Sequence, residues 1–293
     1  MREAQQTAGQ TAVAENLRWR RMKRNDSAVP EAMLRVRESW YVGACGRFLS
    51  RTSRDHVWAL RDREANISAL IIHSKRTLLP VFNDRFDVPF PRFLKRFFSV
   101  IPIHAVQGLK KEALVLEGLI EKTGLRAAQN IDYDLMALNG MPGESCFLSG
   151  PRGLILRRPL FTDADALFPL QAAYEQEEVL PEGAEFNAAA CRLGLEHILS
   201  GGQILAAELD GRIVGKINTS AVSFTRYQIG GVYVHPDYRG LGIARRMCAG
   251  FVRGLILQGR GVSLFVKKSN PAARRVYDNI GFRVLADYRI SYY

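Results

Sequence analysis

The sequence predicts an α/β protein with a mixed sheet, divided into two domains. At 293 residues the chain is long for one ordinary domain and sufficient for two. Its hydrophobic fraction of 47% and charged fraction of 24% are those of a soluble globular protein. Strand-like and helix-like hydrophobic patterns alternate in both halves, which favours residues 27–148 and 149–293 as the two domains.

Basic residues gather near the start of the chain. Residues 1–26 combine low hydrophobicity with a basic run, so we expect a disordered tail, and Met22 is an alternative translation start. The net charge of +12 is compatible with nucleic acid, an acidic substrate or a polyanionic cofactor, but no motif in the tail supports nucleic acid. No apolar run approaches the roughly 20 residues of a membrane span. Without a membrane span or a secretory signal, a cytoplasmic location is expected.

The cysteines and histidines show no pattern of a metal or disulfide site. Cys45, Cys146, Cys191 and Cys248 include no Cys-x-x-Cys pair, which predicts reduced thiols and neither disulfides nor zinc. The five histidines are dispersed along the chain, so no metal site is predicted from them.

The N-terminal domain is predicted to contain strands at residues 57–60, 67–74, 77–82 and 99–106, followed by a helix at 110–122. The last strand, Gly108 and the helix repeat an order of strand, glycine and helix that recurs at residues 232–258. One interpretation makes this domain a degenerate copy of the C-terminal one. An unrelated α/β domain is the alternative.

The C-terminal domain can be followed element by element. Thr162 and Asp165 form a capping box, Asp210-Gly211 favours a tight hairpin turn, and Gly281 ends the last helix. The predicted elements are a strand at 153–158, helices from 162 and at 187–199, strands at 203–209, 212–224 and 228–235, a helix at 245–258, a strand at 262–266, a helix at 271–279 and β runs at 282–286 and 288–293.

A turn suited to a pyrophosphate lies between the strand at 228–235 and the following helix. Arg239 supplies a charge, while Gly240 and Gly242 lack the Cβ atoms that would block close approach of the backbone. N–H groups at the start of the helix near Ile243 favour an anion. A Rossmann fingerprint would need G-x-G-x-x-G and a P-loop would need Gly-Lys-Ser/Thr, and the turn contains neither. It therefore predicts a nucleotide-like cofactor.

Two motifs in this half resemble the GNAT acyltransferase superfamily. The R-x-x-G-x-A pattern from Arg239 to Ala244, with strand residues 232–234 before it, resembles the acyl-CoA-binding motif of that family. Residues 269–282 resemble its N-x-x-A-x-x-x-Y-x-x-x-G-F block, with Asn270 and Tyr277 at the named positions. The resemblance covers residues 149–293 and implies a GNAT fold for them.

The resemblance implies transfer of an acetyl group from acetyl-CoA, as co-substrate, to an amine, without a metal. The residues that it places at the cofactor are Val232, Tyr233, Val234, Arg239, Gly240, Leu241, Gly242, Ile243, Ala244, Arg245, Asn270 and Tyr277. Tyr277 matches the family's general acid and Asn270 a residue that binds the pantetheine. Their alternative roles are a packing ring and the cap of a helix. A backbone N–H near Val234 is the implied oxyanion donor, where strands splay at 232–234 and 265–266.

The motifs do not identify the general base. Phe265 stands where some members of the family carry a glutamate. Glu178, beside Glu177 after the first helix, is the candidate base and second catalytic residue. Further options are Tyr233, His235 and Glu208. A water chain without a dedicated base is also compatible.

Two functions of different classes follow from this site. The first is an N-acetyltransferase whose amine acceptor, a small molecule or a protein, is unidentified. The second is a non-catalytic acyl-CoA-binding regulatory protein. Nucleic-acid binding by the tail has the weakest support, and a homodimer is left open. No R-x-x-G-x-A pattern occurs around Gly108, so no second cofactor site is expected in the N-terminal domain.

Overall fold

The computed structural model describes residues 17–23, 26, 28–64, 66–83 and 91–293. The chain forms two units. Unit 1 comprises residues 1–132 and 287–293, and unit 2 comprises residues 133–286. The boundary differs from the expected one at 148/149, because residues 133–138 pair with a strand of unit 2. None of the described helices is long and apolar enough to cross a membrane.

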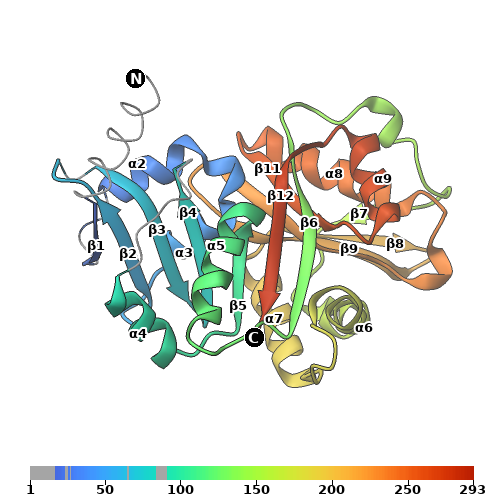
Figure 1. The fold of residues 1–293 in the computed structure, drawn as a ribbon. Coiled ribbons are helices and arrows are strands. Elements are labelled where there is room, and N and C mark those ends of the chain that lie inside the picture. The colour runs from blue at the N-terminus through green and yellow to red at the C-terminus, as the bar shows by residue number, and fades with distance from the viewer. Residues whose placement is uncertain (1–16, 24–25, 27, 65, 84–90) are drawn as a thin grey trace. The chain divides into compact units, whose positions relative to one another are not determined.

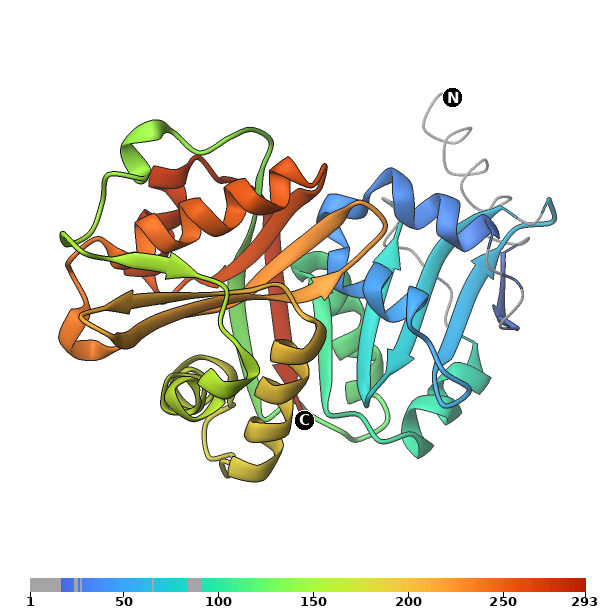
Figure 2. The ribbon, with the colours of Figure 1, turned by 180° about the vertical axis from the view of Figure 1, so that it is seen from behind.

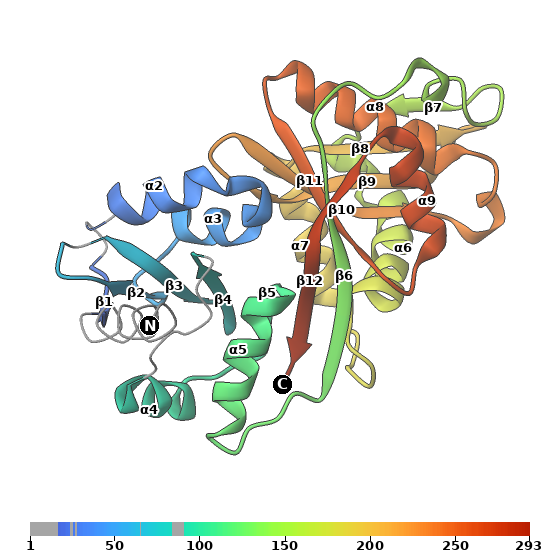
Figure 3. The same cartoon turned by 45° about the horizontal axis from the view of Figure 1, so that its top comes forward.

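Unit 1 is a sheet between two pairs of helices. Its elements are β1 (Arg18–Arg21), α2 (Ala28–Val36), α3 (Val42–Leu49), β2 (His56–Arg61), β3 (Ile67–Ser74), β4 (Thr77–Phe82), α4 (Arg92–Val100), β5 (Ala105–Leu109), α5 (Lys110–Glu121) and the end of β12 (Arg283–Tyr292). The strand order is β1-β2-β3-β4-β5-β12. Figure 3 shows α2 and α3 on one face of this sheet and α4 and α5 on the other. The core beside α4 and α5 includes Leu94, Phe98 and Leu116.

Two expectations for this unit do not hold. Part of the expected disordered tail is strand β1, which pairs with β2 from Arg18↔Arg61 onward and buries Trp19, while residues 1–16 lie outside the described part. The strand expected at 99–106 is instead the end of α4 followed by β5. The apolar residues of this segment serve two elements, because Phe98 ends the core face of a helix and Ala105 begins a strand.

Unit 2 is also a sheet with helices on both faces. Its elements are β6 (Gln129–Leu138, from Tyr133 on), β7 (Ile155–Arg157), α6 (Ala164–Tyr174), α7 (Ala188–Gly201), β8 (Ile204–Leu209), β9 (Arg212–Val222), β10 (Arg226–Val234), α8 (Ile243–Leu257), β11 (Gly261–Lys267), α9 (Pro271–Ile280) and the start of β12. The strand order is β6-β11-β10-β9-β8-β7. Helices α8 and α9 cover one face, and α6 and α7 cover the other (Figures 1 and 2).

The two units share one order of elements. From β1 in unit 1 and from β7 in unit 2, the chain runs strand, two helices, three strands, helix, strand, helix, and in each run the fourth and fifth strands pair in parallel. This agrees with the interpretation of unit 1 as a degenerate copy. The counterpart of the segment from β10 to α8 is, however, the segment from β4 to α4, and not the one around Gly108 as the sequence suggested. Residues 83–91 contain no glycine, although 84–90 lie outside the described part.

Local signals explain several element ends in unit 2. Asn187 Oδ1 accepts from the N–H of Ala190 at the start of α7 (2.9 Å). Asp210 and Gly211 both have positive φ, 50° and 74°, as a type I′ turn between β8 and β9 requires. The Thr162–Asp165 capping box is wrong, because Asp163 instead accepts from the N–H of Leu160 (2.6 Å).

Candidate active site

The parallel strands β10 and β11 diverge at their C-terminal ends. Their ladder pairs Arg226–Ile229 with Gly261–Leu264 and ends there. Residues 230–234 of β10 continue alongside β9, and residues 265–267 of β11 continue alongside β6. We call the opening between these diverging ends the splay. In the described part of the chain these two strand ends do not pair with each other, as the resemblance implied.

A bulge in β10 sets which backbone groups face the splay. Gly230 pairs with Asn218 and Tyr233 with Lys216, so two residues of β10 lie opposite one residue of β9. The N–H of His235 donates to Val214 O on β9 (2.9 Å). Because successive residues of an antiparallel strand alternate in their pairing, the N–H of Val234 points to the opposite edge, toward the splay. This is the backbone N–H that the sequence assigned to an oxyanion.

The turn after β10 leads into helix α8. Gly240 and Gly242 have φ of 81° and 80°, a backbone region in which glycine is favoured. A Cβ at Gly242 would lie 3.0 Å from Gly150 N, whereas a Cβ at Gly240 would meet only open space. Gly242 caps α8, whose first-turn N–H groups lack intrahelical acceptors. The turn and the start of α8 thus have the backbone geometry expected of an anion site, although Arg245 donates to Ser149 Oγ.

Arg239 is held beside this turn by three groups. Its Nε donates to Val234 O (3.1 Å), its guanidinium lies over the ring of Tyr233, and its terminal nitrogen pairs with Glu177 Oε2 (3.1 Å). The Tyr233 hydroxyl donates to Glu177 Oε1 (2.6 Å), and this bond, together with Arg239, lowers the pKa of Glu177. Burial and the same bond raise the pKa of Tyr233 to about 12. Neither Glu177 nor Tyr233 is therefore suited to act as a base near neutral pH.

Glu178 and Asn270 lie together beside the end of β11, and Tyr277 follows on α9. Asn270 caps α9 by accepting from the N–H of Ala273 (3.0 Å) and donates to Glu178 Oε1 (3.1 Å). Lys267 pairs with Glu178 Oε2 (3.2 Å). Tyr277 is 8% exposed and packs edge-on against Phe282. Burial, with smaller effects from groups that include Glu178, raises the pKa of Tyr277 well above its ordinary value. The phenol therefore stays protonated at neutral pH.

The remaining candidates for the base lie in other surroundings. His235 Nδ1 accepts from the N–H of Asp237 (3.4 Å) and so caps the turn after β10. Glu208 lies on β8 and pairs with Arg157 of β7 (2.6 Å). Strand β9 lies between β8 and β10 in the sheet. Phe265, which stands where some members of the family carry a glutamate, packs edge-on against Tyr133. Of the predicted bases, Glu178 is the one whose charge influences the pKa of Tyr277, and it is hydrogen-bonded to Asn270 at the start of the same helix.

Sequence reasoning missed a buried lysine beneath the bulge. Lys216 is fully buried, and its Nζ donates to Gly231 O (2.9 Å) and Asn218 Oδ1 (3.0 Å). Burial lowers its pKa to about 7, against opposing effects of Glu175 and Cys191. The one sequence signal was a lysine among apolar residues of a predicted inner strand, where a charge is unusual.

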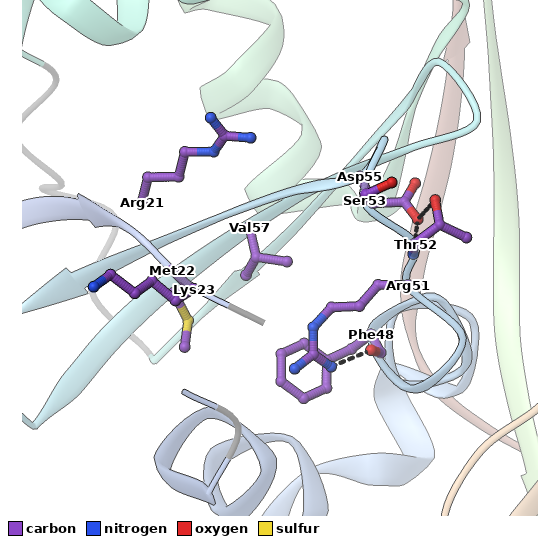
Figure 4. A pocket seen from close by; sticks show the side chains of 9 residues that line it. All are labelled: Arg21, Met22, Lys23, Phe48, Arg51, Thr52, Ser53, Asp55 and Val57. Carbon is purple, nitrogen blue, oxygen red and sulfur yellow. Dashed lines mark hydrogen bonds between the residues drawn. The ribbon is translucent and has the colours of Figure 1, made fainter. Parts of the chain in front are cut away.

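A separate hollow of about 450 Å³ lies in unit 1 (Figure 4). Two of its basic side chains are engaged within the unit: Arg51 donates to Phe48 O and stacks on the Phe48 ring, and Arg21 hydrogen-bonds His56. Asp55 accepts from both the N–H and the hydroxyl of Thr52. The hollow contains none of the predicted site residues, so it does not belong to the site around the splay.

Parallel strands that diverge at their C-terminal ends and lead into a glycine turn and a helix agree with the fold that the resemblance implies. Residues 165–282 match the model of the Acetyltransferase (GNAT) family, so the C-terminal half of the chain contains a GNAT domain. No curated protein matches the sequence.

Solved structures show a similar fold over most of the chain. A GCN5-related N-acetyltransferase from Sphaerobacter thermophilus is 17% identical over 94% of each chain, with a TM-score of 0.60. A tandem GNAT protein from the clavulanic acid biosynthesis pathway is 12% identical over 94% of this chain and 97% of its own, with a TM-score of 0.55. The chain spans 65% of a GNAT-family protein from Novosphingobium aromaticivorans, with 57% of this chain covered, 20% identity and a TM-score of 0.44.

The pairing of Arg239 with Glu177 leads to a prediction about affinity. Glu177→Gln removes the carboxylate that competes with a phosphate for Arg239, so we expect acyl-CoA to bind somewhat more tightly, by roughly fivefold at most, the scale of an exposed ion pair. Isothermal calorimetry with acetyl-CoA measures this. Glu185→Gln, an exposed substitution in the following loop, is the control and should change nothing. Weaker binding to Glu177→Gln would contradict the prediction.

Proposed function

We propose that the protein transfers an acetyl group from acetyl-CoA to an amine acceptor. The observation that carries the proposal is the divergence of β10 and β11, with the N–H of Val234 directed at the splay. The buried phenol of Tyr277, on the helix that follows β11, stays protonated and supports it. The anion turn at Gly240–Gly242 follows directly from the same strand. Acyl transfer needs these groups, because negative charge develops on the carbonyl oxygen and a thiolate must leave.

The residues fit an acyl-CoA. Above Gly240 there is open space where a side chain would lie, and the first turn of α8 favours a phosphate there. When bound, acyl-CoA supplies an acyl group activated as a thioester. Tyr277 holds the proton suited to a leaving thiolate, and the N–H of Val234 is suited to the oxyanion. Glu178, fixed by Asn270 and Lys267, is the proposed acceptor of the amine proton, directly or through water.

The test is a screen of amines with acetyl-CoA and the full chain, with released thiol as the readout. Protein N-termini, lysine peptides, polyamines, amino acids and aminoglycosides cover the acceptor classes. Acetyl-CoA binding with thiol release that depends on the amine supports the proposal. Binding without turnover for any amine supports the runner-up, a non-catalytic acyl-CoA-binding regulator, which the substitution of Phe265 for a family glutamate favours.

We also expect one acetyl-CoA per chain. Residues 83–91, which correspond in sequence order to the glycine turn, contain no glycine, the residue that close approach of a backbone to a pyrophosphate favours. Calorimetric stoichiometry on the full chain measures this. Two molecules bound per chain would show that unit 1 has kept a cofactor site of its own.

A further inference from the structure

The bulge of β10 decides which N–H faces the splay. Without it, the register at Gly230↔Asn218 would continue and place Val234 opposite Val214. Val234 would then take the position that His235 occupies, with its N–H directed at β9 and away from the splay. The single extra residue in β10 therefore turns the proposed oxyanion donor toward the ligand.

The bulge is held from beneath by Lys216. Gly231, at φ 59°, turns its carbonyl out of the ladder, and Lys216 Nζ donates to that carbonyl at 2.9 Å. No side chain fits at position 231, because a Cβ there would lie 2.0 Å from Asn218 Oδ1 and 2.9 Å from Lys216 Nζ. Lysine and asparagine, both on β9, thus fill the space that the glycine leaves.

A buried ammonium at this place requires an explanation. Lys216 Nζ lies 4.9 Å from the centre of the Tyr174 ring and close enough to Glu175 and Cys191 to be influenced by their charges. Gln171 donates to Glu175 Oε1 (2.8 Å), which holds that carboxylate at the end of α6. Burying a charge is unfavourable, and a protein with an apolar side chain of similar size at the same position is often as stable or more stable. A structural role alone therefore explains the lysine poorly.

We propose that Lys216 is a positioning residue for acyl transfer, which fixes the bulge through the Gly231 carbonyl and thereby holds the N–H of Val234 toward the splay. The proposal rests on the proposed function for its catalytic consequence. Its structural consequence can be measured separately. Lys216 does not contact the reacting atoms in this account, since its Nζ is bonded to Gly231 and Asn218 on the α6 and α7 face of the sheet.

The test substitutes Lys216→Met in the full chain, which removes the donor and keeps a long unbranched side chain. Gln228→Met is the matched control: Gln228 is also buried, lies on β10 at the separate register shift between Gln228 and Ile229, and bonds Ser220 Oγ. We expect amide hydrogen exchange in residues 230–235 to become faster in Lys216→Met and to stay unchanged in the control. We further expect kcat for acyl transfer to fall at least roughly 10-fold, with KM for acetyl-CoA within about twofold.

The possible outcomes separate the two proposals. Unchanged exchange in residues 230–235 of a folded Lys216→Met chain overturns the role of Lys216, whatever the activity. Faster exchange in Lys216→Met supports the role of Lys216 in holding the bulge. If the unsubstituted chain binds no acetyl-CoA, the proposed function is rejected and this role remains. An equal loss of kcat in Lys216→Met and Gln228→Met overturns the proposal. If Lys216→Met does not fold, Lys216→Gln, which keeps an N–H donor on a shorter side chain, is measured in the same way.

Discussion

Replacing Tyr277 by phenylalanine is expected to lower kcat for acyl transfer by roughly 10²-fold or more, the scale of a positioned general acid. The substitution removes only the hydroxyl and keeps the ring that packs against Phe282. Affinity for acetyl-CoA should change little. Steady-state kinetics together with calorimetry separate the two quantities, and a matching loss of affinity would mean that the hydroxyl holds the cofactor instead.

The pH profile adds a second measurement on Tyr277. Because burial raises its pKa above the ordinary value near 10, the acid form persists through neutral and mildly alkaline pH. We therefore expect no alkaline loss of kcat from this residue below about pH 10. Tyr227→Phe, on β10 before the bulge, serves as the control and should leave kcat unchanged.

Replacing Gly242 by valine should weaken acetyl-CoA binding by roughly 10²-fold or more, because two or more charge-assisted bonds to phosphate would be lost. Valine is strained at φ 80°, and its Cβ would press on Gly150 N at 3.0 Å. Relief of this contact must move the turn and with it the first N–H groups of α8. Calorimetry on the folded variant measures the loss.

The control for Gly242→Val isolates the backbone strain. Gly211 has a similar φ of 74° but lies in the hairpin turn between β8 and β9, where a Cβ meets nothing within 4 Å. Gly211→Val should therefore destabilise the chain by a comparable amount of strain and leave acetyl-CoA binding intact. Unchanged affinity in Gly242→Val would remove the assignment of the turn as an anion site.

The parts of the site that sequence could predict depend on local signals. The glycine turn, the Asn270 cap and the spacing of Tyr277 all lie within short segments, and the GNAT domain they indicated is confirmed. Lys216 depends instead on the register between β9 and β10, which a one-residue shift decides. No short sequence pattern predicts the pairing register between these two strands. The role of a residue that acts through a neighbouring strand was therefore beyond the sequence.

The same distinction applies to the fold. Hairpins such as that at Asp210-Gly211 follow from turn chemistry and were predicted, whereas the helices α2 and α3 and the strand β6 were missed. The two β runs expected at 282–286 and 288–293 are one strand, β12. The strand continues through Asp287, a residue with low strand propensity, and from Tyr288 on it pairs with β5, far away in the sequence.

The course of β12 bears on how the chain is made. Residues 105–109 leave the ribosome long before residues 288–292, their partners in the sheet of unit 1. Until then the edge of β5 is open to pairing with other chains, a recognised hazard for a half-made domain. The final contacts of Tyr293, whose N–H donates to His104 O, close that edge. The N-terminal unit is thus the first to be synthesised and, by this strand, the last that can be completed.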